Sequence, residues 1–326
     1  MPPAGQSVRA DPGGRHRFAV PRSGVAPYPE RTMPIFHLEA EPDLISPVLV
    51  VHLNGFMDAG GAADAATIAL LDSIDPTVVA TFDGDAIMDY RARRPVVRLV
   101  EGVATELIWP EPVLRAGKDG EGRDVLVLSG PEPDMRWHEF CDDIVTLASS
   151  FGTTLTLGFG AFPAPVPHTR PVRLASTASS SELAEAVGYV PGTLDVPGSA
   201  QSAIERAIAD AGMAAVGLWA RVPHYVAQVA YPAATVALLD GLATLTGIRV
   251  DTSELINEGS ATRTRIESLI TNSQDHMTMV RLLEEQFDRE AAEPGGTGGG
   301  LVAPGQPLPS ADELAAELER FLRGET

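Results

Sequence analysis

The sequence predicts an α/β protein whose mostly parallel sheet is covered by helices on both faces and is followed by a helical subdomain. Residues 48–72 read as a buried strand, a loop with glycines and an Ala-rich helix, which is how an α/β domain begins. Apolar runs and helical patterns then alternate along the chain. From residue 233 the strand patterns stop, and helical patterns continue to about residue 292.

The strands and helices of the core follow from local patterns. The first strand, 48–53, is an unbroken apolar run, and the helix at 62–72 follows its loop. Further apolar or β-branched runs predict strands at 77–82, 96–100, 105–109, 124–128, 153–158, 172–176 and 214–220. Glu101 and Gly102 are typical of a hairpin turn, and the last four runs have the profile of buried parallel strands. Helical patterns cover 136–150, 181–187 and 199–211.

The region from 233 onward predicts helices only. One helix covers 233–246 and ends at Gly247, and residues 251–253 supply capping oxygens for the next. Apolar residues then recur three and four positions apart: Ile266, Leu269, Ile270, Met277, Val280, Leu283 and Phe287. This predicts a helical hairpin, or a helix broken near Asn272, that packs on the sheet or on a partner.

Changes in composition and in hydrophobic pattern along the chain indicate its domain organisation. We expect a disordered leader at 1–33, a core at 34–232, a helical subdomain at 233–292, a flexible linker at 293–309 and an amphipathic tail helix at 310–326. Met33 is a second candidate for the start codon. The tail helix opens with a capping box and has one apolar stripe, Leu314, Leu318, Phe321 and Leu322. It is too short to be stable alone, so we expect it to dock on the oligomer.

The composition excludes several classes of protein. A formal net charge of −20 disfavours binding to nucleic acid or to anionic membranes. No apolar run approaches the roughly 20 residues that span a bilayer. The single cysteine excludes an intrachain disulfide and fits a cytoplasmic protein.

Three segments hold candidate pocket or partner-binding residues. The loop that contains Asp58, Gly60 and Gly61 precedes a helix and could hold an anion, but its acidic character favours glycines with a structural role. His168, Thr169 and Arg170 follow a strand and would suit a carboxylate or phosphate; the alternative is that they pair locally. His224 and Tyr225 lie in an aromatic loop that covers either a pocket or the core.

Other candidate sites have simpler interpretations. Gly158 and Gly160 suggest a dinucleotide fingerprint, but Pro163 stands at its third position. The carboxylates of Asp83, Asp85 and Asp89 precede three arginines, which favours internal ion pairs or a subunit contact over a metal. Cys141 shares a helical face with apolar residues and should be buried. We therefore expect no catalytic residue, no cofactor and no metal.

The segments HLNGFMDAGGAADAA, DYRARRP, GPEPDMRWHEF, LGFGAFPAPVPHTRPV and ARVPHYVAQVAYP resemble the actinobacterial branch of the PAC2 family, named after a proteasome assembly chaperone. The resemblance covers about 35–290. It implies a three-layer αβα core like that of nucleoside phosphorylases, a C-terminal helical addition and a homo-oligomer. Archaeal relatives dock on the proteasome through a C-terminal hydrophobic–Tyr–any-residue motif. Residues 323–326 do not match it, so docking by that route is not expected.

Two functional hypotheses follow. The first is a non-catalytic, cytoplasmic assembly or scaffolding factor that forms a homo-oligomer, with a trimer as first choice, and binds a protein client. The second is an enzyme or small-molecule binder with a pocket made by Asp58, His168, Arg170 and His224. An enzyme should show these groups converging on one site, whereas a scaffold should show them paired and a large apolar surface on the helical region.

Overall fold

The computed structural model describes residues 33–292 of the chain. Internal contacts divide the chain into two units, residues 1–33 and 34–326, and the account below concerns the described part of the second. The predicted linker and tail helix, and the predicted leader apart from Met33, lie outside the described residues. Within the described range, no helix combines the length and the apolar character needed to cross a membrane.

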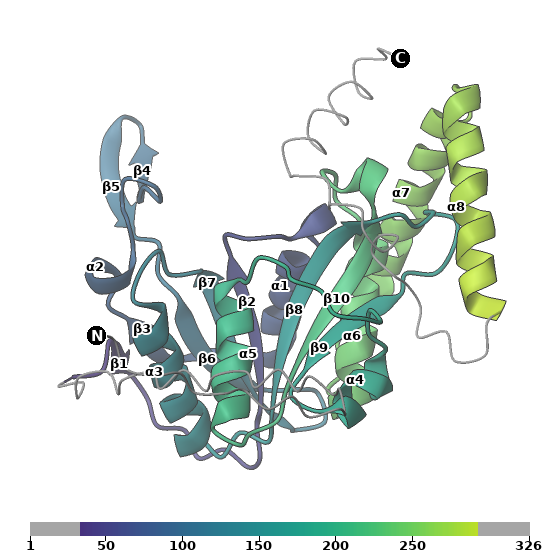
Figure 1. The fold of residues 1–326 in the computed structure, drawn as a ribbon. Helices are drawn as coiled ribbons and strands as arrows, with labels where there is room; N and C mark the ends of the chain where they lie inside the picture. Colours follow the sequence, from purple (N-terminus) through teal and green to yellow (C-terminus); the bar gives the residue numbers. More distant parts are fainter. Residues whose placement is uncertain (1–32, 293–326) are drawn as a thin grey trace, which may run out of the picture. The chain divides into compact units, whose positions relative to one another are not determined.

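An eight-stranded sheet forms the centre of the fold (Figure 1). Its spatial order is β1 (Phe36–Leu38), β3 (Thr77–Phe82), β6 (Val113–Lys118), β7 (Asp124–Pro131), β2 (Val48–Asn54), β8 (Leu155–Ala164), β10 (Ala215–Pro223) and β9 (Leu174–Ala178). The four neighbours β7, β2, β8 and β10 are parallel, and the other pairings are antiparallel. The predicted, mostly parallel sheet is therefore confirmed, with antiparallel strands at both ends.

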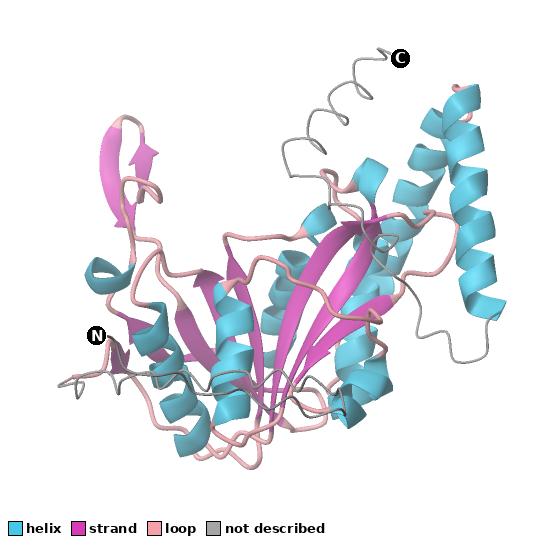
Figure 2. Cartoon of the chain, viewed as in Figure 1, coloured by secondary structure: helices cyan, strands magenta, loops and turns pink. Residues whose placement is uncertain are grey.

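Helices cover both faces of the sheet, as Figure 2 shows. The alternation of side chains in β2 separates two cores: Val50 faces one, and Leu49 and Val51 face the other. The first core contains α1 (Ala62–Ile74) and α6 (Pro232–Thr246), which contact each other. The second contains α3 (Trp137–Ser150) and α5 (Ala200–Asp210). The expected three-layer αβα architecture is confirmed.

Sequence patterns missed two strands and misjudged one. β1 is only three residues long, and β6 contains Gly117 and Lys118, which are poor strand formers. A Cβ atom on Gly117 would lie 2.4 Å from the carbonyl oxygen of Ile74, so only glycine fits beneath the end of α1. β9 was expected to be a buried parallel strand, but it is an antiparallel edge strand whose second half is largely exposed.

A separate hairpin leaves the sheet after β3 and the short helix α2 (Gly84–Ile87). Its strands are β4 (Val96–Val100) and β5 (Val103–Ile108), and the turn residues Glu101 and Gly102 both have positive φ. The predicted hairpin is present, although its second strand begins two residues earlier than expected. Every residue of β4 and β5 is exposed, and Figure 1 shows the hairpin extending away from the large sheet.

The C-terminal helices form the predicted pair, α7 (Ser253–Ile270) and α8 (Gln274–Ala292), with a break between them. Ile266, Ile270 and Phe287 are buried, and the first two join the same core as α1 and α6. Leu269 was expected in this apolar stripe but is 58 % exposed. Between β9 and α5, a short helix, α4 (Ser181–Val187), has the predicted bounds.

Candidate functional site

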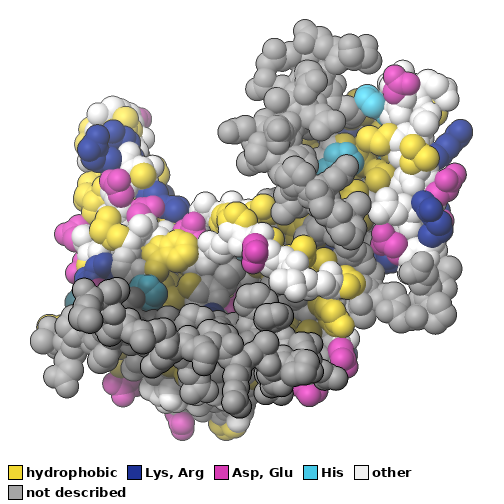
Figure 3. Space-filling view, in the orientation of Figure 1, with side chains coloured by type: hydrophobic (Ala, Val, Ile, Leu, Met, Phe, Trp, Pro, Cys, Tyr) yellow, Lys and Arg dark blue, Asp and Glu magenta, His cyan; other side chains and the backbone are white. Residues whose placement is uncertain are grey.

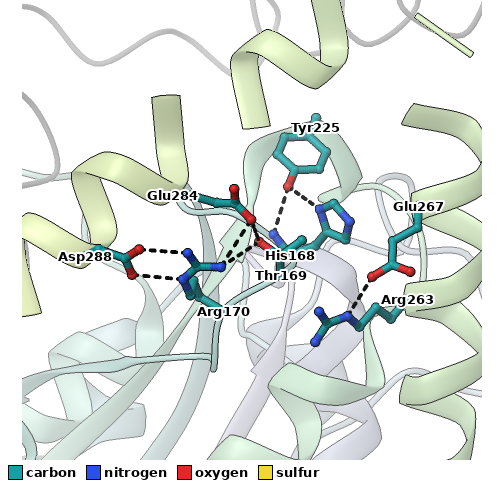
Figure 4. A network of polar contacts seen from close by, with 8 residues as sticks. All are labelled: His168, Thr169, Arg170, Tyr225, Arg263, Glu267, Glu284 and Asp288. Carbon is teal, nitrogen blue, oxygen red and sulfur yellow. Dashed lines mark hydrogen bonds and ion pairs between the residues drawn. The ribbon is translucent and has the colours of Figure 1, made fainter. Parts of the chain in front are cut away.

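The residues predicted around 168–170 lie beside α8, in the loop between β8 and β9 (Figure 4). The Arg170 guanidinium binds the Asp288 carboxylate through two parallel hydrogen bonds of 2.9 and 2.7 Å, and its third nitrogen lies 3.1 Å from Glu284 Oε1. The Thr169 hydroxyl donates to the same Glu284 oxygen. These partners raise the pKa of Arg170 and lower that of Asp288. The planar fork of arginine matches a carboxylate, so this pair fixes the loop against α8.

A second arginine, Arg173, attaches the same loop to α8. Its guanidinium lies 3.6 Å from the centre of the Phe287 ring and donates to the Phe287 carbonyl oxygen at 3.3 Å. Another of its nitrogens lies 3.5 Å from Glu290 Oε2. Sequence reasoning missed Arg173. The available signal was the spacing of Phe287 and Glu290, which three residues apart share one face of a helix.

His168 and Tyr225 form a buried polar pair. The Tyr225 hydroxyl accepts the backbone N–H of His168 at 2.8 Å and lies 2.8 Å from His168 Nδ1. The tautomer of the imidazole decides the donor in this second contact: the hydroxyl donates to a bare Nδ1, or Nδ1–H donates to the hydroxyl oxygen. Burial lowers the pKa of His168 and raises that of Tyr225. The pair is therefore neutral at physiological pH.

The surroundings of this pair come from the aromatic loop and from α7. The His224 ring packs edge-on against Tyr225, with centroids 5.3 Å apart. Arg263 and Glu267, which pair with each other on α7, act on the pKa of His168 in opposite directions. His168, Thr169, Arg170 and Tyr225 are thus brought together. The hydroxyl and guanidinium groups are directed at His168 and at α8, whereas His168 Nε2 is buried and has no hydrogen-bond partner among the described residues.

Asp58, Gly60 and Gly61 lie apart from that cluster, at the start of α1. The Asp58 carboxylate accepts the backbone N–H groups of Ala63 at 2.8 Å and Asp64 at 3.0 Å, so it caps α1. Gly60 donates its N–H to the carbonyl of Ala227 at 2.7 Å and accepts the N–H of Tyr231 at 3.1 Å. The candidate loops at 58–61 and 224–231 therefore meet through their backbones.

Close packing explains Gly60. Its φ is 69°, and a Cβ atom there would lie 2.8 Å from Cβ of Tyr231. Gly61 also has a positive φ, but a Cβ atom there would meet nothing within 4 Å. Gly60 therefore leaves room for the aromatic loop that contains Tyr231, and the positive φ of both glycines forms the turn into α1.

Two ionisable groups that sequence reasoning missed lie elsewhere, one on a strand and one on a helix. His52, on β2, is buried; its Nδ1 is 3.3 Å from the Phe159 carbonyl oxygen and its Nε2 is 4.0 Å from Asp64, and burial lowers its pKa. Burial raises the pKa of Glu205, on α5, to about 7. The only sequence signal for His52 is a histidine inside an apolar strand.

Glu205 explains the glycine that suggested a dinucleotide site. Its carboxylate accepts from Thr177 Oγ1 at 2.7 Å and from Gln201 Nε2 at 3.2 Å. A Cβ atom on Gly158 would lie 2.3 Å from Gln201 Nε2 and 2.7 Å from Glu205 Oε1. Because Gly158 has no side chain, the polar side chains of α5 can pack directly against the sheet at this position.

The remaining candidates take structural positions. Asp83 caps α2, and Arg93 pairs with Asp134 at 3.0 Å rather than with the aspartates that precede it in sequence. Within residues 33–292, no group of three or more His, Cys, Asp or Glu side chains is placed to hold a metal ion. Cys141 is buried as expected, which raises the pKa of its thiol to about 12.

Comparisons with known proteins give consistent results. Residues 52–270 match the model of the PAC2 family. A protein of unknown function from Corynebacterium glutamicum is 31 % identical with a TM-score of 0.74, over 79 % of this chain and 98 % of that one. A Mycobacterium tuberculosis proteasome-assembly chaperone homologue is 32 % identical with a TM-score of 0.67, and the match covers 72 % of this chain and 99 % of that one. A PAC2 family protein from Streptomyces avermitilis is 33 % identical with a TM-score of 0.66, and the match again covers 72 % of this chain and 99 % of that one. No curated protein matches the chain.

Proposed function

The chain belongs to the PAC2 family, and from that premise we propose that it is a non-catalytic assembly or scaffolding factor in the cytoplasm. It binds a protein client and self-associates, with a trimer as the proposed form. The candidate pocket residues serve in this proposal to hold the helices and loops in place.

One observation supports this function above the others: the charged groups of Arg170 and Asp58 in the candidate pocket are engaged within the fold. Arg170 directs three nitrogens at carboxylates of α8, and Asp58 directs both oxygens at the start of α1. An enzyme or small-molecule binder built on Asp58, His168, Arg170 and His224 would need these groups to face a common ligand. A scaffolding protein needs them only to fix its surfaces.

The client we propose is a proteasome subunit or assembly intermediate. The support is the Mycobacterium tuberculosis relative, whose name is proteasome-assembly chaperone homologue and which aligns over 72 % of this chain. The strongly acidic character of the chain fits a protein client better than a nucleic acid.

Reconstitution tests this function. Purified α and β subunits of the proteasome from the same organism are mixed with and without the protein, and native mass spectrometry follows the intermediates. An unrelated protein of similar net charge serves as the control. We expect a complex with a subunit or an intermediate and faster formation of the complete particle. Absence of any complex, with unchanged assembly kinetics, would exclude the proteasome as the client.

Self-association is measured separately by light scattering. A trimer has three times the 34.4 kDa mass of one chain. A monomer mass at micromolar concentration would refute self-association and leave the client experiment unaffected.

A further inference from the structure

The hairpin β4–β5 is apolar on both faces. The pairs Val96–Ile108, Arg98–Glu106 and Val100–Val103 share one face, on which the Arg98–Glu106 ion pair separates the apolar residues. The pairs Val97–Leu107 and Leu99–Ala104 form the other face, which has no charged residue. With Trp109, eight apolar side chains are between 40 and 64 % exposed: Val96, Val97, Leu99, Val100, Val103, Leu107, Ile108 and Trp109.

Such a ribbon is poorly stabilised on its own. A two-stranded hairpin is marginally stable in water unless one of its faces packs against another element. Monomeric proteins also rarely expose contiguous apolar patches larger than a few hundred Å². Among the described residues, the one aromatic contact of the hairpin lies at its base, where the Trp109 ring packs edge-on against the Tyr90 ring with centroids 4.6 Å apart. The exposed faces therefore fit a protein partner.

The base of the hairpin also carries unpaired positive charge. Residues 91–98 contain four arginines and no acidic residue, in a chain whose net charge is −20. Arg93 pairs with Asp134, and Arg98 pairs with Glu106. Within the described residues, the exposed guanidinium groups of Arg91 and Arg94 have no ion-pair partner. Figure 3 shows dark blue and yellow side chains together on this projection.

One acidic surface of the described chain is the first half of α7. Residues 251–262 contain Asp251, Glu254 and Glu258 and no basic residue. Glu254 and Glu258 are four residues apart, which places them on one side of the helix, and both are exposed. Ile256, which is 53 % exposed, is two residues from each glutamate and therefore lies on the opposite side of the helix. Across the described residues, neither carboxylate has an ion-pair partner.

We propose that the β4–β5 hairpin of one copy docks on the first half of α7 of a second copy. Arg91 and Arg94 face Glu254 and Glu258, and the uncharged face of the hairpin lies against the same side of α7, where Ala261 is exposed. Two hairpins meeting each other would instead bring four unpaired arginines together, which is unfavourable. The two surfaces differ and flank opposite ends of the sheet, so the contact is head-to-tail, and in the proposed trimer three such contacts form a closed ring.

Charge reversal and charge exchange in the full-length protein test this contact. Arg91→Glu/Arg94→Glu and, separately, Glu254→Arg/Glu258→Arg should each raise the dissociation constant of the oligomer by roughly tenfold or more. The chain that carries all four substitutions should return to the wild-type mass. The matched control, Arg281→Glu/Arg289→Glu, makes the same charge change on α8 and should assemble normally. Sedimentation velocity measures the masses, and circular dichroism confirms that each variant is folded.

Val97→Ser/Leu99→Ser tests the apolar part of the contact and should also release monomer. This inference rests on the self-association in the proposed function, and the two fail differently. A monomeric wild type refutes both. A wild-type oligomer that tolerates the charge reversals, or that the four-substitution chain fails to restore, refutes only the hairpin contact. Loss of client binding by the Val97→Ser/Leu99→Ser variant, with the oligomer intact, also refutes only the hairpin contact. In that case the hairpin binds the client rather than a second copy.

Discussion

Replacing Gly60 by alanine should destabilise the protein much more than replacing its neighbour Gly61. Both glycines have positive φ, 69° and 59°, so both substitutions impose the left-handed conformation on a residue with a Cβ atom. That conformation costs roughly 1–2 kcal/mol. At Gly61 this is the whole cost, because the new Cβ atom would have no neighbour within 4 Å.

At Gly60 a second cost adds to the first. The new Cβ atom would lie 2.8 Å from Cβ of Tyr231, far inside normal contact. The residue cannot move aside without losing its hydrogen bonds to Ala227 and Tyr231, at 2.7 and 3.1 Å. Overpacking of a buried site typically costs about 1–3 kcal/mol. We therefore expect Gly60→Ala to lose about 2–5 kcal/mol of unfolding free energy in total.

Urea unfolding of the two variants beside the wild type measures both losses, with circular dichroism as the signal. The difference between the variants isolates the contact with Tyr231, since the backbone term is common to them. Equal losses would show that the aromatic loop yields freely, and the assignment of Gly60 to close packing would be wrong.

Three further predictions follow from the site. The pKa of Glu205 is 4.5 in the unfolded chain and about 7 in the folded protein, so the stability of the wild type should fall relative to that of Glu205→Gln as pH rises between these values. An equal difference in urea midpoint between the two proteins at about pH 4 and at about pH 8 would contradict this. Cys141 should react with a thiol reagent only after unfolding, because burial raises its pKa to about 12; rapid labelling of the native protein would show that the helix α3 opens. ATP with magnesium should give no saturable hydrolysis, because the loop before α1 has no phosphate-binding lysine and Asp58 already caps that helix; hydrolysis that Asp58→Ala abolishes would overturn this interpretation.

Local patterns predicted the elements whose signal lies within a few residues. The unbroken apolar run of β2 and the helix after it were predictable, because both patterns are complete within residues 48–72. The direction of β9 was not predictable, since alternation of side chains is the same in parallel and antiparallel strands. β6 was missed because its stability comes from pairing with β3 and β7 rather than from its own composition.

The same division holds for the candidate site. Asp58 as a helix cap could have been predicted, because an aspartate shortly before a helix is a common capping residue. The partner of Arg170 could not, since Asp288 is 118 residues away in sequence. Gly158 shows how a motif misleads: its small size serves Gln201 and Glu205 on another element. The expected apolar surface was placed on the helical region, whereas the largest group of exposed apolar side chains among the described residues lies on the hairpin.

The attachment of α8 determines how mechanical force would travel through the molecule. A partner that binds beyond Ala292 pulls on α8, and the ion pairs of Arg170 and Arg173 transmit that tension to the loop between β8 and β9. β8 lies between β2 and β10 in the middle of the sheet, so the pull reaches the most buried strands. Because the coupling consists of charged contacts on a partly exposed surface, concentrated salt should weaken this mechanical connection before it disturbs the cores. Tension on the C-terminal end would therefore be resisted by this loop together with the buried Val280 and Leu283 of α8.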